Sequence, residues 1–321
     1  MNSNFILVVN GEPNSVFSEI FVKSINKLKV KTPIIYIFSE KLLKKQMKKL
    51  KLNKKIQLIN INKLNDYKLN NNSINLINID YKQKESFKKI SDRSQQFIKK
   101  SFDTAFKIIK KEKIKKFING PISKKTFLNK NFLGMTEYIS KKFKVKKNAM
   151  LIFNKKLSVC PLTTHVPLKQ VTKNINKYLI IEKVKLITDF YKSKLKKKPK
   201  IAVIGLNPHC ESIEKFNEDE KIILPTINFL KKSNYKIYGP FSADTIFLRQ
   251  NRKKFDVILG MYHDQVLTPI KTLFEYDAIN ITLGLPFIRI SPDHGPNEKM
   301  LGKNISNPLS LIRSIEFLDK N

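Results

Sequence analysis

Three histidines each follow a short apolar run of the length of a β-strand: His165 in TTHVPL, His209 in GLNPHCE and His263 in MYHDQ. Neutral imidazoles bind divalent metals well, and three protein ligands leave coordination positions open for a substrate. Because these residues are far apart in the sequence, they can share one ion only if the fold brings them together. The alternative interpretation is three unrelated polar histidines on loops.

Charged residues near these histidines could take part in the same chemistry. Asp264 directly follows His263, where a carboxylate can orient a metal-binding imidazole or transfer a proton. Lys271 lies in the apolar stretch that follows and suits an anionic ligand. Asp244, in GPFSADT, is either a carboxylate of the site or a helix cap. For Asp264 and Lys271 the alternative is an ordinary helix N-terminus and a surface lysine.

A second group of residues suits the binding of anions. Arg289 follows the apolar run INITLGLPF, and Arg binds carboxylates and phosphates through two parallel hydrogen bonds. Asn280 stands near the start of this run. The segments NGPISK and GMTEYIS put glycine and hydroxyl residues at expected helix starts, where free N–H groups bind anions. A structural ion pair for Arg289 and ordinary helix capping are the alternatives.

The chain alternates between apolar runs of strand length and longer amphipathic stretches. Ile, Val and flanking turn residues favour strands in the apolar runs. We expect these strands at 5–10, 33–38, 55–61, 74–79, 115–120, 149–153, 157–164, 201–207, 235–240, 256–262 and 279–287. We expect helices after Ser18, over 86–113, over 168–197 and from Pro308 to Leu318. This alternation predicts an α/β protein with mostly parallel sheets.

The composition limits the class of protein. A chain of 321 residues that is 41% hydrophobic suits two globular domains and is too apolar for a disordered chain. No stretch approaches the roughly 20 apolar residues of a membrane span. The start lacks the features of a secretory signal, and two cysteines form no disulfide framework. We therefore expect a cytoplasmic protein.

The net charge of +37 raises the alternative of a basic nucleic-acid-binding protein. The charge comes mostly from Lys residues that are scattered along the chain in pairs on expected helices, with no basic arm or tail. This pattern favours a solvated basic surface over a dedicated nucleic-acid site. Such a surface would still attract anionic substrates.

In combination, the motifs resemble those of the 4-hydroxythreonine-4-phosphate dehydrogenase family of vitamin B6 biosynthesis. The resemblance covers most of the chain in order and rests on VNGEP, NGPISK, GMTE, TTHVPL, GLNPHCE, GPFSADT, MYHDQ, NITLGLPFIR and DHG. It implies two α/β/α domains around a cleft, as in isocitrate and isopropylmalate dehydrogenases. It further implies a first domain of residues 1–125 with 270–321, and a second of 126–269 that carries most metal ligands and dimer contacts. The sequence has no GxGxxG motif of a Rossmann domain.

The resemblance also implies an activity. The expected reaction is NAD- or NADP-dependent oxidation of 4-phosphooxy-L-threonine at C3, followed by metal-assisted decarboxylation to 3-amino-2-oxopropyl phosphate in pyridoxal phosphate biosynthesis. The expected metal is one divalent ion, Zn, Mg or Co. The protein is expected to form a homodimer with shared active sites. No specific nucleic acid or membrane partner is expected.

Site residues follow from the resemblance position by position. The matched metal ligands are His165, His209 and His263, the matched substrate contacts are Thr136, Lys271, Asn280 and Arg289, and the matched catalytic residues are Asp244, Asp264 and Lys271.

Two departures from the family pattern concern substrate binding. Met135 stands where the family has a substrate-contacting histidine, and Met cannot supply the hydrogen bond or proton of that side chain. The loop after Gly11, Glu12 and Pro13 has also lost two glycines of the pattern. The alternative within this class is therefore a related dehydrogenase of 4-phospho-D-threonate or 4-phospho-erythronate.

Overall fold

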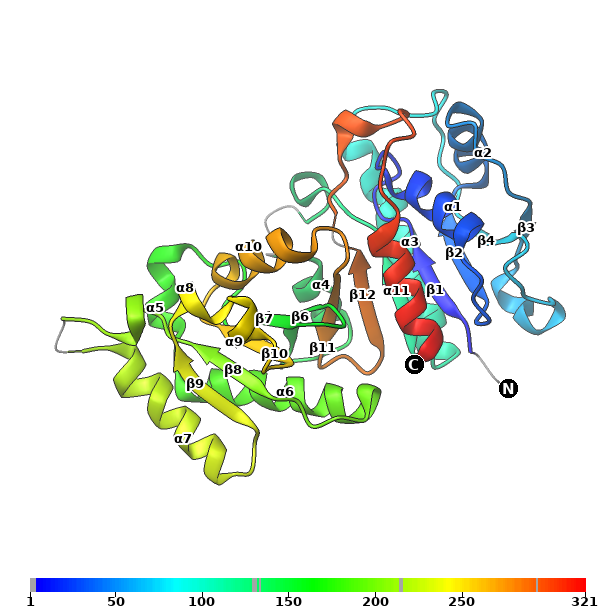
Figure 1. The fold of residues 1–321 in the computed structure, drawn as a ribbon. Coiled ribbons are helices and arrows are strands. Elements are labelled where there is room, and N and C mark those ends of the chain that lie inside the picture. Colours follow the sequence, from blue (N-terminus) through cyan, green and yellow to red (C-terminus); the bar gives the residue numbers. More distant parts are fainter. Residues whose placement is uncertain (1–3, 129–131, 133, 214–215, 293) are drawn as a thin grey trace. The chain divides into compact units, whose positions relative to one another are not determined.

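The computed structural model describes residues 4–128, 132, 134–213, 216–292 and 294–321, and the chain divides into two compact units (Figure 1). Unit 1 consists of Met1–Met135 and Pro286–Asn321, and unit 2 consists of Thr136–Leu285. These limits lie beyond 125 and 269, where the sequence placed the domain boundaries. Segment 270–285 belongs to unit 2 because it contains the end of a helix that packs on the core of unit 2 and a strand that pairs there.

The strands of unit 1 are all parallel and follow the order β3-β4-β2-β1-β5-β12. Their bounds are β1 Ile6–Val9, β2 Ile34–Phe38, β3 Ile56–Leu58, β4 Ile74–Asn78, β5 Lys116–Asn119 and β12 Ile288–Pro292. Every residue of β1 and β2 is buried. This explains why both strands are uninterrupted apolar runs, since a parallel strand is covered on both faces.

Four helices cover this sheet: α1 Phe17–Lys27, α2 Glu40–Lys49, α3 Gln95–Lys111 and α11 Leu309–Lys320. In α1 the buried apolar residues Phe17, Ile20, Phe21 and Ile25 recur at helical spacing and form one face. Figure 1 shows α1 and α11 on one face of the sheet and α3 behind it. Layers of helix on both faces are the arrangement that a parallel sheet requires.

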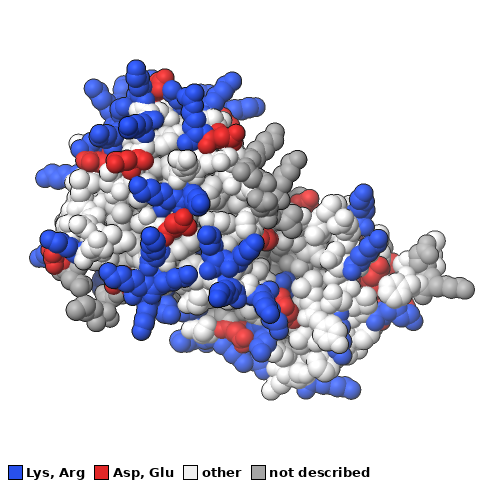
Figure 2. Space-filling model, turned by 180° about the vertical axis from the view of Figure 1, so that it is seen from behind, with Lys and Arg blue, Asp and Glu red and all other residues white. Residues whose placement is uncertain are grey.

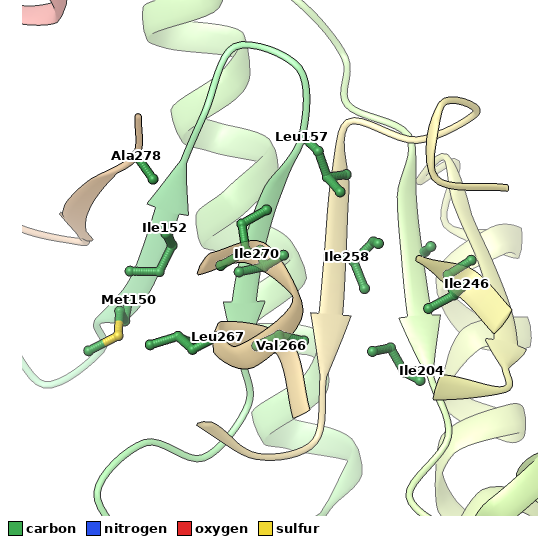
Figure 3. Packing of buried hydrophobic residues seen from close by; sticks show 12 residues of the cluster. Met150, Ile152, Leu157, Ile204, Ile246, Ile258, Val266, Leu267, Ile270 and Ala278 are labelled. Atoms are coloured by element: carbon green, nitrogen blue, oxygen red, sulfur yellow. The ribbon is translucent and has the colours of Figure 1, made fainter. Parts of the chain in front are cut away.

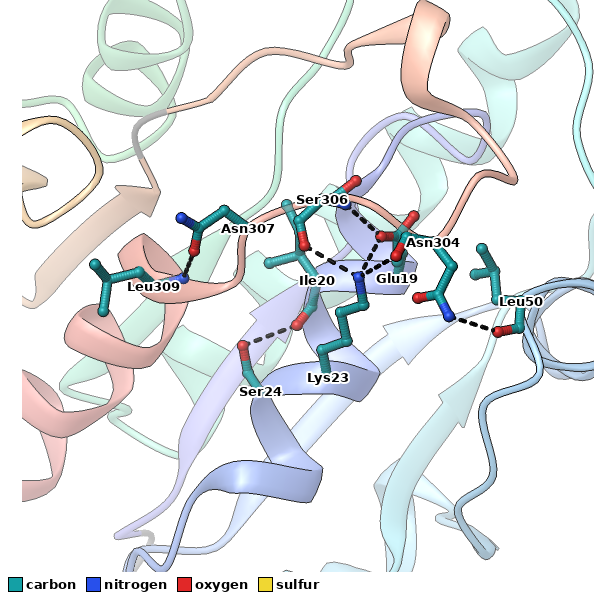
Figure 4. A network of polar contacts seen from close by, with 9 residues as sticks. All are labelled: Glu19, Ile20, Lys23, Ser24, Leu50, Asn304, Ser306, Asn307 and Leu309. Atoms are coloured by element: carbon teal, nitrogen blue, oxygen red, sulfur yellow. Dashed lines mark hydrogen bonds and ion pairs between the residues drawn. The ribbon is translucent and has the colours of Figure 1, made fainter.

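A buried ion pair connects α1 to the loop before α11 (Figure 4). The Glu19 side chain is 1% exposed and accepts hydrogen bonds from Lys23 Nζ and from the backbone N–H of Ser306, both at 2.7 Å. Lys23 Nζ also donates to the carbonyl oxygens of Asn304 at 2.9 Å and Ser306 at 3.1 Å. Residues far apart in the sequence are thus joined by hydrogen bonds to charged groups.

Unit 2 has the strand order β11-β6-β7-β10-β8-β9. Its strands are β6 Ala149–Phe153, β7 Ser158–Pro161, β8 Ile201–Ile204, β9 Ile237–Phe241, β10 Val257–Gly260 and β11 Ile279–Leu283. The pairs of β6 with β11 and β7 are antiparallel, whereas β7, β10, β8 and β9 are parallel neighbours. The predicted α/β fold with mostly parallel sheets is therefore confirmed.

The helices of unit 2 are α4 Met135–Lys142, α5 Val171–Asn174, α6 Lys177–Leu195, α7 Leu224–Lys232, α8 Ala243–Ile246, α9 Arg249–Arg252 and α10 His263–Phe274; the first residue of α4 falls in unit 1. Figure 3 shows how Val266, Leu267 and Ile270 of α10 pack over the strands of the core. Burying each such side chain stabilises the fold by about 1.5–3 kcal/mol. This packing fixes the direction of α10 and hence the place of His263 at its start. No helix in the described ranges combines the length and apolarity needed to cross a bilayer.

Several expected elements differ from the structure. The expected helix 168–197 is divided into a 3-10 turn, α5 and α6, and α1 begins at Phe17 instead of after Ser18. The segment 279–287 contains β11 and then a turn at Gly284, and strand β12 follows, which the sequence did not predict. Gly284 has φ +91°, and a Cβ there would lie 2.3 Å from the carbonyl oxygen of Lys147. The expected helix 86–113 begins only at Gln95, after a short 3-10 turn over Asp92–Ser94, because side-chain hydrogen bonds hold much of the preceding segment in an irregular conformation.

Candidate functional site

Four parallel strands of unit 2 bring the predicted residues to one edge of the sheet. Because β7, β10, β8 and β9 are parallel neighbours, their carboxyl ends lie along the same edge, where open α/β sheets bind ligands. His165 follows β7, His263 follows β10, His209 follows β8 and Asp244 follows β9. The strand that precedes His263 lies between the strands that precede the other two histidines.

His165 and His263 lie next to each other, with ring centroids 6.0 Å apart. His263 Nδ1 lies 2.7 Å from Asp264 Oδ1, a contact in which the ring N–H donates and the carboxylate accepts. His165 Nδ1 is buried and has no hydrogen-bond partner within the described ranges. Two imidazoles bound to one ion at about 2.1 Å have ring centres roughly 5–6.5 Å apart. The spacing of the rings, and a His165 Nδ1 that makes no hydrogen bond in the described structure, therefore fit a shared ion.

His209 lies on the loop after β8 and is exposed, with φ +56°. Its Nδ1 is 3.5 Å from Ser242 Oγ, which comes directly after β9. Over the described ranges, no group of three His, Cys, Asp or Glu side chains is close enough to hold a metal ion. The structure thus brings two of the three predicted ligands together and places the third on a neighbouring loop at the same edge.

A buried carboxylate fixes the base of the His209 loop. Asp219, 1% exposed, accepts hydrogen bonds from the N–H groups of Leu206 at 2.8 Å and Asn207 at 3.0 Å, and from the Asn207 side chain at 3.0 Å. A Cβ on Gly205 would lie 2.5 Å from Asp219 Oδ1, so only glycine fits beside this carboxylate. The loop is therefore ordered at its base, close to its strand, and exposed at His209.

The other predicted residues of unit 2 differ in exposure. Asp244 is exposed in the first turn of α8, and Lys271 is exposed near the end of α10. Asn280 lies on β11, and its buried Oδ1 has no hydrogen-bond partner in the part of the chain described. A buried polar atom without a partner costs about 1–3 kcal/mol. Asn280 thus has an acceptor that a ligand hydroxyl or amine could satisfy.

Thr136, on α4, is 8% exposed and lines a small cavity of about 40 Å³. The cavity is also lined by Glu137, whose Oε1 lies 3.8 Å from His165 Nδ1, and by the buried Lys183 of α6. Lys183 Nζ donates to the carbonyl oxygen of Asn148 at 2.5 Å and to Glu182 Oε1 at 3.1 Å. Neither Glu137 nor Lys183 was predicted from the sequence as a site residue. The sequence did offer one signal for Lys183, which is that a lysine lies within the apolar face of α6.

Arg289 and Met135 belong to unit 1. Arg289 lies on β12, is 2% exposed, and donates from Nε to Asn119 Oδ1 at 2.7 Å. Met135 is the half-buried first residue of α4. Asp293, which belongs to the DHG motif, lies outside the described residues.

A second buried carboxylate lies at the carboxyl end of β1 in unit 1. Glu12 is fully buried, and its carboxylate accepts hydrogen bonds from the Asn14 N–H at 3.2 Å and from Ser94 Oγ at 2.9 Å. Burial raises the pKa of this carboxyl, the two hydrogen bonds oppose that effect, and the charge of Glu298 adds to it. Glu12 therefore anchors the altered loop to the start of α3.

The sequence matches the profile of a known protein family and is similar to curated proteins of that family. The profile of a family described as "Pyridoxal phosphate biosynthetic protein PdxA" matches residues 29–318. The chain is 38% identical over 317 residues to a "4-hydroxythreonine-4-phosphate dehydrogenase" of Sulfurihydrogenibium sp., covering 97% of this chain and 96% of that protein. It is 32% identical over 225 residues to a "D-threonate 4-phosphate dehydrogenase" of Pectobacterium atrosepticum, covering 67% and 69% of the two chains.

Solved structures agree with this result. A 4-hydroxythreonine-4-phosphate dehydrogenase of Klebsiella pneumoniae superposes with a TM-score of 0.84 at 25% identity and 98% coverage of both chains. An isocitrate dehydrogenase of Methylococcus capsulatus superposes with a TM-score of 0.50 at 10% identity, covering 98% of this chain and 84% of that chain, which shows the fold alone. The family resemblance and the fold expected from the motifs are both confirmed.

Proposed function

Since the chain belongs to the PdxA family of pyridoxal phosphate biosynthetic proteins, we propose that it oxidises 4-phosphooxy-L-threonine at C3 with NAD or NADP. Decarboxylation of the oxidised acid then gives 3-amino-2-oxopropyl phosphate. The observation that supports this proposal most directly is the placement of His165, His209 and His263 at the carboxyl ends of three adjacent parallel strands. We further propose that the protein acts as a homodimer with shared active sites.

The three histidines would hold one divalent ion, Zn, Mg or Co, which when bound polarises the substrate oxygen and favours both steps. Asp264 orients the His263 ring through its contact with Nδ1, so that Nε2 is the nitrogen available for coordination. His165 Nδ1, which makes no hydrogen bond within the described residues and lies 3.8 Å from Glu137 Oε1, would be a second ligand atom. His209, on the exposed loop above the base that Asp219 fixes, would be the third ligand.

The remaining assignments concern protons and anionic groups of the substrate. We assign Asp244, Asp264 and Lys271 to proton transfer, because their exposed side chains can exchange protons with solvent. Within the described residues, Asn280 Oδ1 has no hydrogen-bond partner and could accept from a substrate donor. We assign the hydroxyl of Thr136 to substrate binding as well. Lys271 and Arg289 have the charge to hold phosphate or carboxylate groups.

One substitution favours a second candidate function. Met135 occupies the position of a substrate-contacting histidine in the family pattern, and one relative is named for D-threonate 4-phosphate. The alternative activity is the oxidation of 4-phospho-D-threonate or 4-phospho-erythronate. A parallel assay of NADH or NADPH formation with all three substrates distinguishes the two functions, because kcat/KM compares the stabilisation of each transition state.

The variant His209→Ala tests the assigned site. We expect it to lower both metal content and turnover of 4-phosphooxy-L-threonine by at least tenfold, because it removes one of three metal ligands. Tyr178→Ala is the control, because Tyr178 is 83% exposed on α6 of the same unit. If metal content and turnover stay at the wild-type level in His209→Ala, the assignment is wrong.

A further inference from the structure

The side chain of Gln265 joins two of the loops that carry histidines. Gln265 lies in the first turn of α10, two residues after His263, and is partly buried. Its Oε1 accepts a hydrogen bond from the N–H of Met261 at 2.7 Å, and its Nε2 donates to the carbonyl oxygen of Gly205 at 2.8 Å. Met261 comes two residues before His263, and Gly205 comes four residues before His209. One amide therefore connects the loop after β10 to the loop after β8.

This amide takes the place of a ladder hydrogen bond between the two strands. β8 and β10 are parallel neighbours, and the last pair of their register is Leu259 with Val203. Met261 and Gly205 each lie two residues beyond that pair. Backbone hydrogen bonds hold neighbouring strands about 4.8 Å apart, whereas an inserted side-chain amide sets a wider spacing. Gln265 thus lets the two loops diverge and still fixes the distance between them.

A threonine joins the third loop to the same point. Thr163 comes two residues before His165, is 5% exposed, and donates from Oγ1 to the carbonyl oxygen of Met261 at 2.8 Å. The N–H of Thr163 donates to the same oxygen at 3.2 Å. Met261 is fully buried, and its N–H and its carbonyl oxygen each hold a different neighbouring loop. The loops of His165, His209 and His263 are therefore connected through Met261.

The surrounding backbone is shaped for these contacts. A Cβ on Gly260 would lie 3.0 Å from Gln265 Oε1 and 2.4 Å from Val266 Cγ1, so a glycine leaves the space that the amide needs. The N–H of Gly205 donates to the carbonyl oxygen of Phe241 at 3.0 Å, which holds the other side of this residue to the end of β9. Loss of a buried hydrogen bond leaves its partner unsatisfied, which is costly. The contacts therefore favour one arrangement of the loops.

We propose that Gln265 and Thr163 are positioning residues that hold the three histidine loops, through Met261, at the spacing needed to bind one divalent ion. They act through the backbone that carries the ligands, and not by contact with the ion. Ligands that are held in place before binding lose less conformational freedom when the metal binds, so the affinity rises. The inference rests on the proposed metal site and adds two residues to it that were not predicted from the sequence.

The test is a zinc titration of metal-free protein with variants that remove these hydrogen bonds and keep the charge. Gln265→Met removes both hydrogen bonds of the amide, and Thr163→Val removes the hydrogen bond of the hydroxyl. Figure 2 shows Lys and Arg side chains spread over much of one face of the molecule, and this positive charge repels zinc from every variant alike. Gln250→Met is the control, because Gln250 is an exposed residue of α9 in the same unit.

We expect Gln265→Met to raise the dissociation constant of zinc about tenfold, which is the lower limit for residues that orient metal ligands. Thr163→Val should raise it less, by about fivefold, because the N–H of Thr163 still donates to Met261. Thr163→Ser keeps the hydroxyl and should bind zinc within about twofold of the wild type, as should Gln250→Met. A role in stability alone would lower the Tm of the metal-free protein and leave the zinc affinity unchanged.

Two failures of the test are distinguishable. Zinc affinities of Gln265→Met and Thr163→Val equal to that of Gln250→Met would overturn the positioning role, whatever the change in Tm. A wild type that binds zinc no more tightly than His209→Ala does would refute the metal site itself and the positioning role with it. Unfolding curves of the metal-free variants show whether each is folded. If Gln265→Met is not, the comparison of Thr163→Val with Thr163→Ser decides by the same criteria.

Discussion

Replacing Asp264 by Asn should weaken metal binding while leaving the shape of the site unchanged. The carboxylate lies 2.7 Å from His263 Nδ1, and the ring donates its proton to it. The Asn amide oxygen can accept the same hydrogen bond, but it carries no charge and therefore makes the imidazole a poorer ligand. The effect on affinity thus reports the charge of Asp264 and not a change in ring orientation.

The size of the effect follows from the exposure of the carboxylate. Removing the partner of a metal-binding histidine lowers metal affinity by about 10- to 100-fold. The Asp264 side chain is 79% exposed, so water screens its charge and the loss should lie near the lower limit, about tenfold. Asp264→Ala removes the hydrogen bond as well and should lower affinity further.

The assay is a zinc titration of metal-free protein in competition with a chromogenic chelator. Asp189→Asn is the control, because it removes an exposed carboxylate from α6 of the same unit and should change zinc affinity by less than about twofold. Equal zinc affinities of Asp264→Asn and Asp189→Asn would refute the role given to Asp264. The same result would weaken the case for His263 as a ligand.

Three further predictions concern stability and reactivity. Glu19→Gln should lower the free energy of unfolding by about 1.5–3 kcal/mol, because it removes the buried partner of an ion pair. Glu40→Gln removes a partly exposed partner from an ion pair of α2 and should change this free energy by less than about 0.5 kcal/mol. Equal urea midpoints of the two variants would contradict this reasoning. Because the pKa of the Glu12 carboxyl is raised in the folded protein, its protonation stabilises the fold fully below about pH 4.5, and this stabilisation is lost as the pH rises through the folded pKa. Glu12→Gln, which stays neutral, should therefore have a higher Tm than the wild type at pH 7, and the difference should disappear towards about pH 4. Burial raises the pKa of the Cys160 thiol to about 12, so a thiol reagent at pH 8 should modify the half-buried Cys210 first and Cys160 only after unfolding; early loss of Cys160 would refute its burial.

The sequence predicted the parallel strands well because a covered strand needs an uninterrupted apolar run. The runs at β1, β2 and β10 show this directly, since each is buried along its whole length. The placement of the three histidines at one sheet edge could also be anticipated, because each follows such a run. The order β7-β10-β8 could not, since pairing of distant strands is not encoded in local patterns.

Other features depended on tertiary contacts that local patterns do not carry. Strand β12 was missed because Gly284 lies in a turn that divides one apolar run into two strands. The start of α3 was misplaced because Asn14 and Gln83 hold part of the preceding segment by mutual hydrogen bonds. The burial of Lys183 was not predicted, because its amine is buried only where it can donate to the carbonyl oxygen of Asn148, a residue far away in the sequence.

The division of unit 1 into two stretches of sequence has a consequence for synthesis of the protein. A growing chain completes all of unit 2 before β12 and α11 leave the ribosome. Until then β5 lacks its outer neighbour, and α1 lacks the helix whose Leu311, Ile315 and Leu318 are fully buried. Domains commonly fold in the order in which they are made. In this protein unit 2 is synthesised after most of unit 1 but can reach its native state first. The N-terminal part of unit 1 keeps apolar surface exposed until β12 and α11 have been made.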